Sequence, residues 1–279
     1  YSETSGVNTV AVESVDQLEP VVKSLATTMS LFSAQMCTSP QNVYVPRDGI
    51  RHAGGRIGAD EFGSLLAQAM ASIAADPKRA APIMAAIQSA STPALIDQLA
   101  EEGARRGRIL LASSPYAHPE FARARTRTPL LVGLDAGARD LYGEERFGPI
   151  GFVIETNDAT GALESATSDV RAAGGITAFV YSQRDDFLAA AEAISIKSGG
   201  HRHHVARFLL VELLIGVHLA LYVAETALHA QRRVDELHRG HQLLGGRALQ
   251  MRDVLERLLS RLTAGHNRCE QRGNQQTPG

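Results

Sequence analysis

The segment 32–42 places a cysteine, Cys37, between a predicted helix and a predicted strand. A thiol at such a junction can meet backbone N–H groups that are not committed to hydrogen bonds. Groups of this kind stabilise a thiolate, or the oxyanion that forms when the thiolate attacks a carbonyl. A lone cysteine after a helix is more often a small buried apolar residue, so a reactive Cys37 needs support from other segments.

Two other segments supply carboxylates that such a thiol could use. Glu3 lies 34 residues before Cys37, and Glu145 opens a Glu-Arg-Phe-Gly-Pro sequence that also contains Phe147. Cys37 itself lies in a Gln-Met-Cys-Thr sequence. In this order the three segments resemble those of the aldehyde dehydrogenase superfamily.

The resemblance covers about residues 1–196. Residues 35–50 look most like the branch of the family that acts in bacterial phenylacetate degradation. Two positions depart from the usual pattern: the family commonly has Glu-Leu-Gly-Gly where this chain has Glu-Thr-Ser-Gly, and glycine where it has Ala34.

The resemblance implies a role for each of the four residues. Cys37 would be the nucleophile that adds to an aldehyde, so that the thiohemiacetal expels hydride to NAD or NADP and leaves a thioester. Glu3 would be the general base that activates water to clear the thioester. Glu145 would hydrogen-bond the nicotinamide ribose, and Phe147 would lie beside the ring. Full-length relatives are expected to be homo-oligomers acting on a small-molecule aldehyde.

These residues have alternatives. Glu145 could be a solvated loop acid and Phe147 an ordinary core residue, while the neighbouring Glu144 fits the Phe-Gly-Pro register less well. A CoA-acylating aldehyde dehydrogenase would keep Cys37 and need no base, which the presence of Glu3 disfavours. A non-catalytic fragment whose tail helices mediate association is a second alternative, from a different class of protein.

Composition indicates a soluble chain. Of its 279 residues, 44% are hydrophobic and 21% are charged, close to the globular average. Its two cysteines make no disulfide framework, so a reducing cytoplasm is the simplest setting. The chain begins at Tyr1, on what resembles a catalytic segment, and shows no Gly-x-Gly-x-x-Gly after a strand. We therefore expect a fragment that lacks most of its nucleotide-binding domain and is inactive alone.

Alternating strands and helices over residues 1–196 predict an α/β fold, an open and mostly parallel sheet with helices on both faces. This would be an incomplete catalytic domain of the aldehyde dehydrogenase type. The expected strands are 7–12, 42–45, 109–111, 130–132, 151–154 and 176–181. The expected helices are 16–34, one capped by Asp60, 78–90, 93–105, 158–173 and 186–194, with a loop between 111 and 130.

The composition changes after residue 200. Residues 1–200 hold 17 Lys and Arg against 23 Asp and Glu, whereas residues 201–279 hold 11 against 7, with eight of the ten histidines. We expect a helical tail at 197–266 and a disordered terminus at 267–279. Because an Arg-, His- and Leu-rich stretch without lysine is typical of GC-rich DNA read out of frame, the tail is either a frameshift product or a separate module.

Three further classes of function are disfavoured. The apolar run 208–223 is interrupted by Glu212 and His218 and is shorter than a membrane helix of about 20 residues. The histidines at 201–204 lack acid or cysteine partners at ligand spacing, so we expect no metal site. The basic tail mixes acids evenly and has few aromatic residues, so we expect no nucleic-acid partner.

Overall fold

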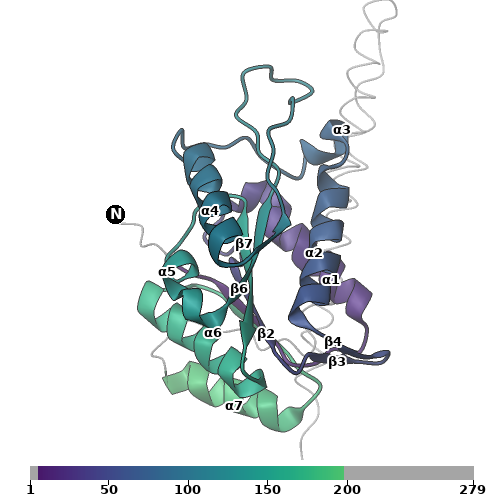
Figure 1. Ribbon diagram of the computed structural model, residues 1–279, viewed down its shortest axis with the longest axis vertical. Coiled ribbons are helices and arrows are strands. Elements are labelled where there is room, and N and C mark those ends of the chain that lie inside the picture. Colours follow the sequence, from purple (N-terminus) through teal and green to yellow (C-terminus); the bar gives the residue numbers. More distant parts are fainter. Residues whose placement is uncertain (1–5, 198–279) are drawn as a thin grey trace, which may run out of the picture. The chain divides into compact units, whose positions relative to one another are not determined.

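The computed structural model describes residues 6–197, and its elements are labelled in Figure 1. The predictions for Glu3 and for residues 198–279, which include most of the expected tail and the whole terminus, lie outside the described residues. The tail and the two domain boundaries placed around it therefore stay predictions.

A six-stranded sheet in the order β5-β6-β7-β2-β1-β8 forms the centre of the fold. All neighbouring strands are parallel except β5, which is antiparallel to β6 at the edge. The predicted open, mostly parallel sheet is confirmed. The strands are β1 Thr9–Val12, β2 Asn42–Pro46, β5 Arg108–Leu111, β6 Leu130–Asp135, β7 Ile150–Thr156 and β8 Ala178–Tyr181.

Seven α-helices accompany the sheet within residues 6–197. They are α1 Leu18–Ser30, α2 Ala59–Ala74, α3 Pro77–Ala80, α4 Thr92–Arg106, α5 Arg139–Tyr142, α6 Ala159–Ala173 and α7 Asp185–Lys197. Figure 1 shows α1 and α2 on one side of the sheet and α4, α6 and α7 on the other.

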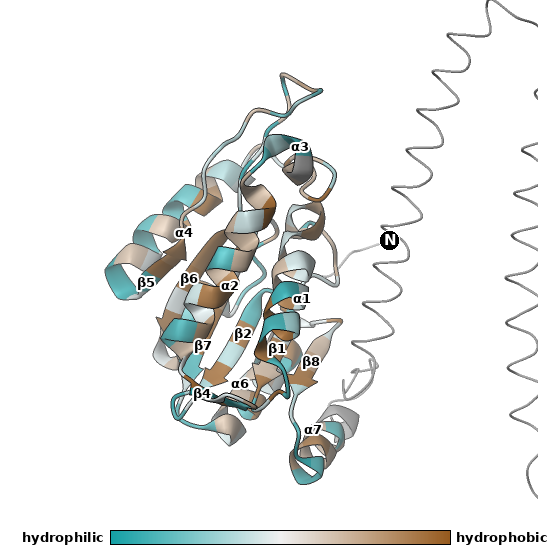
Figure 2. Ribbon diagram, turned by 90° about the vertical axis from the view of Figure 1, so that its right-hand side faces the viewer, coloured by the Kyte–Doolittle hydropathy of each residue, from teal (hydrophilic) through white to brown (hydrophobic). Residues whose placement is uncertain are grey.

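Both faces of the sheet are buried because alternate side chains of each strand serve different cores. Val10 and Val43 face α1 and α2, where they join Phe62 and other residues in one cluster. Their neighbours Ala11 and Tyr44 belong to a second cluster beneath α4 and α6. Hydrophobic residues accordingly concentrate along the strands in Figure 2. This two-sided burial explains why the strands appear in the sequence as short continuous apolar runs.

The helix expected at 78–90 is wrong. The short helix α3 ends at Ala80, and Pro82 follows two residues later. A proline in a helix interior removes a hydrogen-bond donor and clashes with the preceding turn, so the alanine-rich stretch beyond it cannot continue the helix. Residues 83–88 instead run as an irregular segment whose carbonyl groups bind other parts of the chain.

Near α2, one expectation is wrong and one element was not predicted. Asp60 does not cap the helix: the N-cap is Gly58, without a side-chain cap, and Asp60 pairs with Arg108 at 2.5 Å. A small antiparallel hairpin, β3 Ile50–His52 and β4 Gly55–Ile57, was not predicted. Its strands are only three residues long, which is too short for a periodic pattern to be visible.

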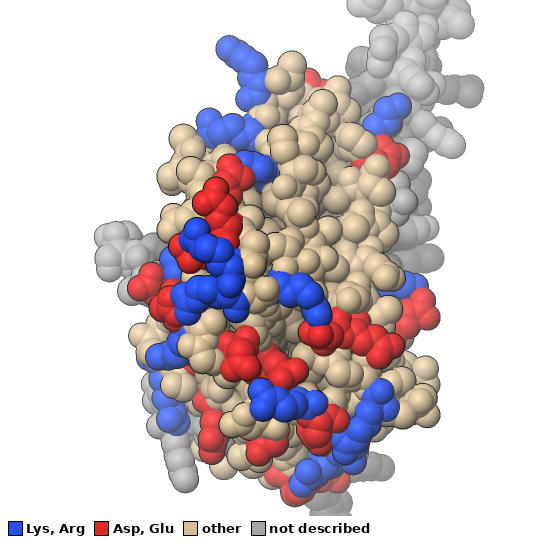
Figure 3. Space-filling view, in the orientation of Figure 1, with Lys and Arg blue, Asp and Glu red and all other residues tan. Residues whose placement is uncertain are grey.

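Charged side chains on the described surface are mostly paired. Figure 3 shows acidic and basic groups interspersed over one face of the molecule rather than separated into large patches of one sign. Glu13 is buried and pairs with Arg51. Burial raises the pKa of Glu13, but hydrogen bonds from Ser14, Ser182 and Arg51 outweigh it and hold that pKa below its usual value. Glu13 therefore acts as a structural ion at the end of β1.

Candidate active site

The predicted site residues lie at the amino ends of parallel strands. The Cys37 turn precedes β2, and Glu145 and Phe147 precede β7. Asn8 directly precedes β1, the strand next to β2. Because the amino ends of parallel strands meet at one edge of a sheet, segments more than 100 residues apart in sequence converge there.

The turn that carries Cys37 is exposed and held from below by one amide. Cys37 is exposed, as is Thr38. The side-chain nitrogen Nδ2 of the buried Asn8 donates to the carbonyl of Cys37 at 2.8 Å and to that of Ser39 at 3.0 Å. Within residues 6–197, the backbone N–H groups of Cys37 and Thr38 donate to no acceptor. The turn thus presents an exposed thiol together with two N–H groups that have no acceptor in the described part of the chain.

Asn8 also connects this turn to the far side of β1. Its Oδ1 accepts hydrogen bonds from the backbone N–H groups of Ile176 at 2.9 Å and Thr177 at 2.8 Å, immediately before β8. The side chain of Asn8 therefore donates two hydrogen bonds and accepts two, and these bonds join three chain segments at the amino edge. The strand pattern gives Asn8 no role, because a polar residue before a strand usually indicates only a turn.

A left-handed turn lies just before Cys37. We predicted a helix over 16–34, but α1 ends at Ser30, and Phe32, Ser33 and Ala34 have φ values of 52°, 55° and 49°. Three consecutive non-glycine residues in this region are strained, at about 1–2 kcal/mol each. The irregular segment 83–88 compensates them with hydrogen bonds: Phe32 N–H donates to Ile83 at 2.7 Å, and Ser33 Oγ donates to Ala85 at 2.7 Å.

We expect Ala34→Gly to raise the free energy of unfolding by about 1 kcal/mol. Glycine adopts a positive φ without the steric penalty that alanine has. The free energy gained by relieving this strain exceeds the free energy lost by removing the buried Ala34 methyl group. Urea unfolding followed by circular dichroism measures the change. Ala189→Gly, at an exposed position of α7, is the control and should lower stability by a similar amount. A destabilised Ala34→Gly variant would contradict a left-handed conformation at this position.

Glu145 and Phe147 lie on a loop that reaches the Cys37 turn. A small pocket is lined by Met36 and Ser39 on one side and by Glu145, Phe147 and Gly148 on the other. Gly148 has a φ of 145°, which glycine adopts readily, and an added Cβ would lie 2.7 Å from a methyl group of Thr92. The loop conformation therefore needs glycine between the aromatic residue and Pro149.

The side chains of this loop differ in exposure. Phe147 is 44% exposed, whereas Glu145 is half-buried. An aromatic face open to solvent beside a carboxylate fits the nicotinamide riboside end of a dinucleotide, which presents a flat ring and two ribose hydroxyl groups. Phe147 is thus not a core residue, and the structure brings it and Glu145 to the Cys37 turn. Glu3 lies outside the described residues, but Gly6, three residues later, lines the same pocket.

A buried polar network lies under the amino edge. Asn42 donates to the carbonyl of Tyr142 at 3.1 Å and to the hydroxyl of Tyr44 at 3.2 Å, and Tyr44 in turn donates to Asp169. Asp169 is also paired with Arg139 at 2.6 Å. Burial, with the charge of Asp169, raises the pKa of Tyr44 far above its usual value, so the phenol stays a hydrogen-bond donor. This network fixes the start of β2 beneath the turn.

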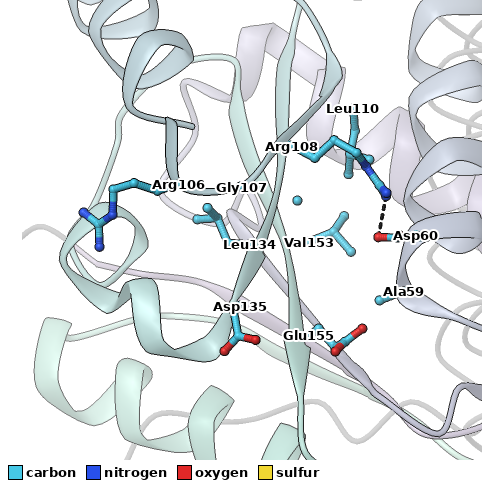
Figure 4. Close-up of a pocket in the computed structure, with 11 residues that line it drawn as sticks. Ala59, Asp60, Arg106, Gly107, Arg108, Leu110, Leu134, Asp135, Val153 and Glu155 are labelled. Atoms are coloured by element: carbon cyan, nitrogen blue, oxygen red, sulfur yellow. Dashed lines mark ion pairs between the residues drawn. The ribbon is translucent and has the colours of Figure 1, made fainter. Parts of the chain in front are cut away.

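A larger cleft lies at the opposite, carboxyl edge of the sheet. It has a volume of about 270 Å³, and Figure 4 shows Asp135 and Glu155 at the ends of their strands, with Arg108 joined to Asp60. Glu155 is also bound by Arg47 at 2.7 Å. Its charged groups are mutually neutralised, and none of the predicted site residues lies in it, so we place the site at the amino edge.

Two other features are absent within residues 6–197. No group of three or more His, Cys, Asp or Glu side chains there could hold a metal ion. No helix in that range has the length and apolar character needed to span a membrane. The apolar run 208–223 and the histidines at 201–204 lie outside the described residues.

The turn that carries an exposed thiol thus meets a Glu-x-Phe-Gly-Pro loop at the amino edge of a parallel sheet. Comparisons with known proteins identify the class of protein to which this arrangement belongs. Residues 1–199 match the family model described as "Aldehyde dehydrogenase family". The chain belongs to the aldehyde dehydrogenase family. No curated protein matches the chain.

Solved structures share the fold of this chain. An NAD-dependent aldehyde dehydrogenase from Burkholderia multivorans is 40% identical with a TM-score of 0.69, and the match covers 74% of this chain and 36% of that one. A variant of proline utilization A from Bradyrhizobium japonicum is 23% identical with a TM-score of 0.54, over 73% and 19%. A protein assigned as a methylmalonate-semialdehyde dehydrogenase from Sinorhizobium meliloti 1021, complexed with NAD, is 14% identical with a TM-score of 0.51, over 68% and 37%.

The second and third of these similarities show the fold alone. The chain spans only about a third of the length of the Burkholderia multivorans enzyme. The activity, substrates and partners of the whole protein are therefore matters for proposal.

Proposed function

We propose that residues 1–196 form the catalytic part of an NAD(P)-dependent aldehyde dehydrogenase that oxidises an aldehyde to a carboxylic acid. The observation that carries this proposal is the convergence of the exposed Cys37 turn with the Glu145 and Phe147 loop at one edge of the sheet. Membership of the family and the 40% identity to an NAD-dependent enzyme support it. A nucleotide bound at this edge, mostly by parts of the protein outside this chain, would supply a hydride acceptor.

Cys37 begins the reaction in this proposal. Its Sγ, as thiolate, forms a bond to the aldehyde carbon, and the carbonyl electron pair moves to oxygen. The N–H groups of Cys37 and Thr38, which donate to no acceptor within residues 6–197, are candidate donors to that oxyanion. The C–H bond then breaks with its electron pair as hydride, and the carbon becomes a thioester of Cys37.

Glu3 completes the cycle as general base. It removes a proton from water, the resulting oxygen nucleophile attacks the thioester, and the C–S bond breaks to release the acid and the Cys37 thiolate. One aldehyde and one water thus give one carboxylic acid, one hydride, for which a bound nucleotide would be the acceptor, and one proton, which Glu3 releases to solvent. Glu145 and Phe147 would hold the nicotinamide riboside end in position.

We assign the substrate to aldehydes of aromatic-acid breakdown, in particular of phenylacetate, because residues 35–50 resemble that branch of the family. Phe32, in the segment just before Cys37, is 48% exposed, and Phe147, on the loop that meets the Cys37 turn, is also exposed. Apolar surface of this kind suits an aromatic side chain. We further propose a cytoplasmic protein that assembles as a homo-oligomer in its full-length form.

Iodoacetamide should modify Cys37 at least about 10-fold faster than Cys269 near neutral pH. The Cys37 side chain is exposed, and the nucleophile of the proposed mechanism reacts as its thiolate, which is the species that iodoacetamide modifies. The rates are measured by mass spectrometry in the single variants Cys269→Ser and Cys37→Ser, so that each thiol is observed alone. A Cys37 that reacts no faster than a cysteine in a short unfolded peptide would contradict an activated nucleophile.

A further inference from the structure

Gln41 links the nucleophile to the loop that carries Glu145. It lies four residues after Cys37 and one residue before β2, and its side chain is 6% exposed. Its Nε2 donates to the carbonyl of Glu144 at 3.0 Å, and its Oε1 accepts from the N–H of Arg146 at 2.6 Å. The two atoms of one amide therefore bind the backbone on both sides of Glu145.

The remaining contacts of Gln41 make this link rigid. Nε2 also donates to the carbonyl of Tyr142 at 3.0 Å, so the chain is held at three points between 142 and 146. The backbone N–H of Gln41 donates to Asn8 at 3.0 Å, and its carbonyl accepts from Phe152 at 2.9 Å. Since Asn8 holds the carbonyl of Cys37, a short chain of hydrogen bonds joins the Cys37 turn to the backbone of Glu145.

We propose that Gln41 is a positioning residue that sets the distance between the Cys37 nucleophile and the carboxylate that binds the nicotinamide ribose. It acts through the backbone on both sides of Glu145. This inference rests on the proposed function for its consequence in nucleotide binding. The hydrogen bonds that support it do not depend on that function. They hold the backbone on both sides of Glu145, the predicted cofactor ligand, whatever that residue binds.

Gln41 holds the backbone around Glu145 with both the donor and the acceptor atoms of its amide. A glutamate at this position keeps an acceptor for Arg146 but loses both donors, and its carboxylate would face two carbonyl oxygens. Protonation of that carboxyl returns one donor, so the glutamate variant should regain order as pH falls. A leucine at this position has neither a donor nor an acceptor.

The test compares amide hydrogen exchange by NMR in the complete 279-residue chain for the parent, Gln41→Leu and Gln41→Glu. Gln68→Leu is the control, since Gln68 is exposed on α2. We expect Gln41→Leu to accelerate exchange at Arg146 and its neighbours in 142–148 by at least about 10-fold, while β2 and β7 keep the parent rates. Exchange at 142–148 in Gln41→Glu should be intermediate in rate and should approach the rate in Gln68→Leu as the pH is lowered. The two variants are measured at each pH.

Binding of nicotinamide mononucleotide, which contains only the ring, ribose and phosphate, is measured in the same samples by NMR titration. Gln41→Leu should weaken binding by about 10-fold, the amount that 1.4 kcal/mol represents, and Gln68→Leu should not. Parent rates at 142–148 in both Gln41 variants, or faster exchange spread through β2 and β7, would overturn the positioning role. A parent chain that keeps the exchange pattern but binds no mononucleotide would count against the nucleotide-binding role proposed for Glu145 and Phe147 and leave the role of Gln41 in ordering the loop intact.

Discussion

Replacing Cys37 by alanine should abolish the formation of reduced nucleotide, including the first turnover. No thiohemiacetal can form without the sulfur, and the C–H bond of a free or hydrated aldehyde does not release hydride at a useful rate. The loss of a nucleophile that acts together with its base costs on the order of 10⁶-fold in comparable hydrolytic enzymes. We therefore expect activity at or below the detection limit.

The measurement needs the nucleotide-binding parts that this chain does not span. A chimera of residues 1–196 with the remaining parts of the Burkholderia multivorans enzyme, which shares 40% identity and the same fold, provides them. Because Cys269 lies outside residues 1–196, the control is Ser72→Ala, at an exposed position of α2, which should leave most activity. Turnover by Cys37→Ala within 10-fold of the parent would exclude Cys37 as nucleophile.

Glu3→Gln should allow a first burst of reduced nucleotide and then stall. Hydride transfer does not need the base, whereas attack of water on the thioester does, and loss of a general base typically costs about 10²–10⁴-fold in the step that it serves. Stopped-flow absorbance of the reduced nucleotide in the chimera separates the burst from the steady state. The neighbouring Glu13→Gln variant would not serve as a control, because Glu13 stabilises the fold through Arg51.

The outcome of this experiment also separates two classes of enzyme. Steady-state turnover by Glu3→Gln at the parent rate, without a burst, would remove Glu3 from the mechanism. Faster turnover with CoA than with water as acceptor would show that a thiol clears the thioester, and the protein would then be a CoA-acylating aldehyde dehydrogenase. Neither outcome would alter the role of Cys37.

Much of the fold could be predicted from the sequence because its strands and helices differ in length and period. The strand at 42–45 and the helix at 158–173 are each confirmed to within a residue or two, as β2 and α6. Glycine at 174, with a φ of 74°, ends α6 in the left-handed conformation that glycine favours. Where local composition and local structure agree in this way, pattern alone is sufficient.

Prediction failed where distant contacts override local preference. The stretch 83–88 contains two alanines and was expected to be helical, yet its carbonyl groups bind the left-handed turn at 32–34. Because Pro82 prevents the helix from continuing, these carbonyl groups are available for such contacts. The same limit applies to the site. Cys37 and Glu145 were found through their resemblance to a family, but Gln41 and Asn8 act through hydrogen bonds to residues about 30 to 170 positions away, which no local pattern reports.

The central claim is that Cys37 becomes covalently acylated during aldehyde oxidation, and intact mass spectrometry of the Glu3→Gln chimera tests it most directly. The protein is mixed with phenylacetaldehyde and NAD, quenched in acid after the burst, and digested to locate the modification. We predict a mass increase equal to one phenylacetyl group in place of a hydrogen atom, on the peptide that contains Cys37. An unmodified Cys37 peptide in a sample that has produced one equivalent of reduced nucleotide would contradict the account.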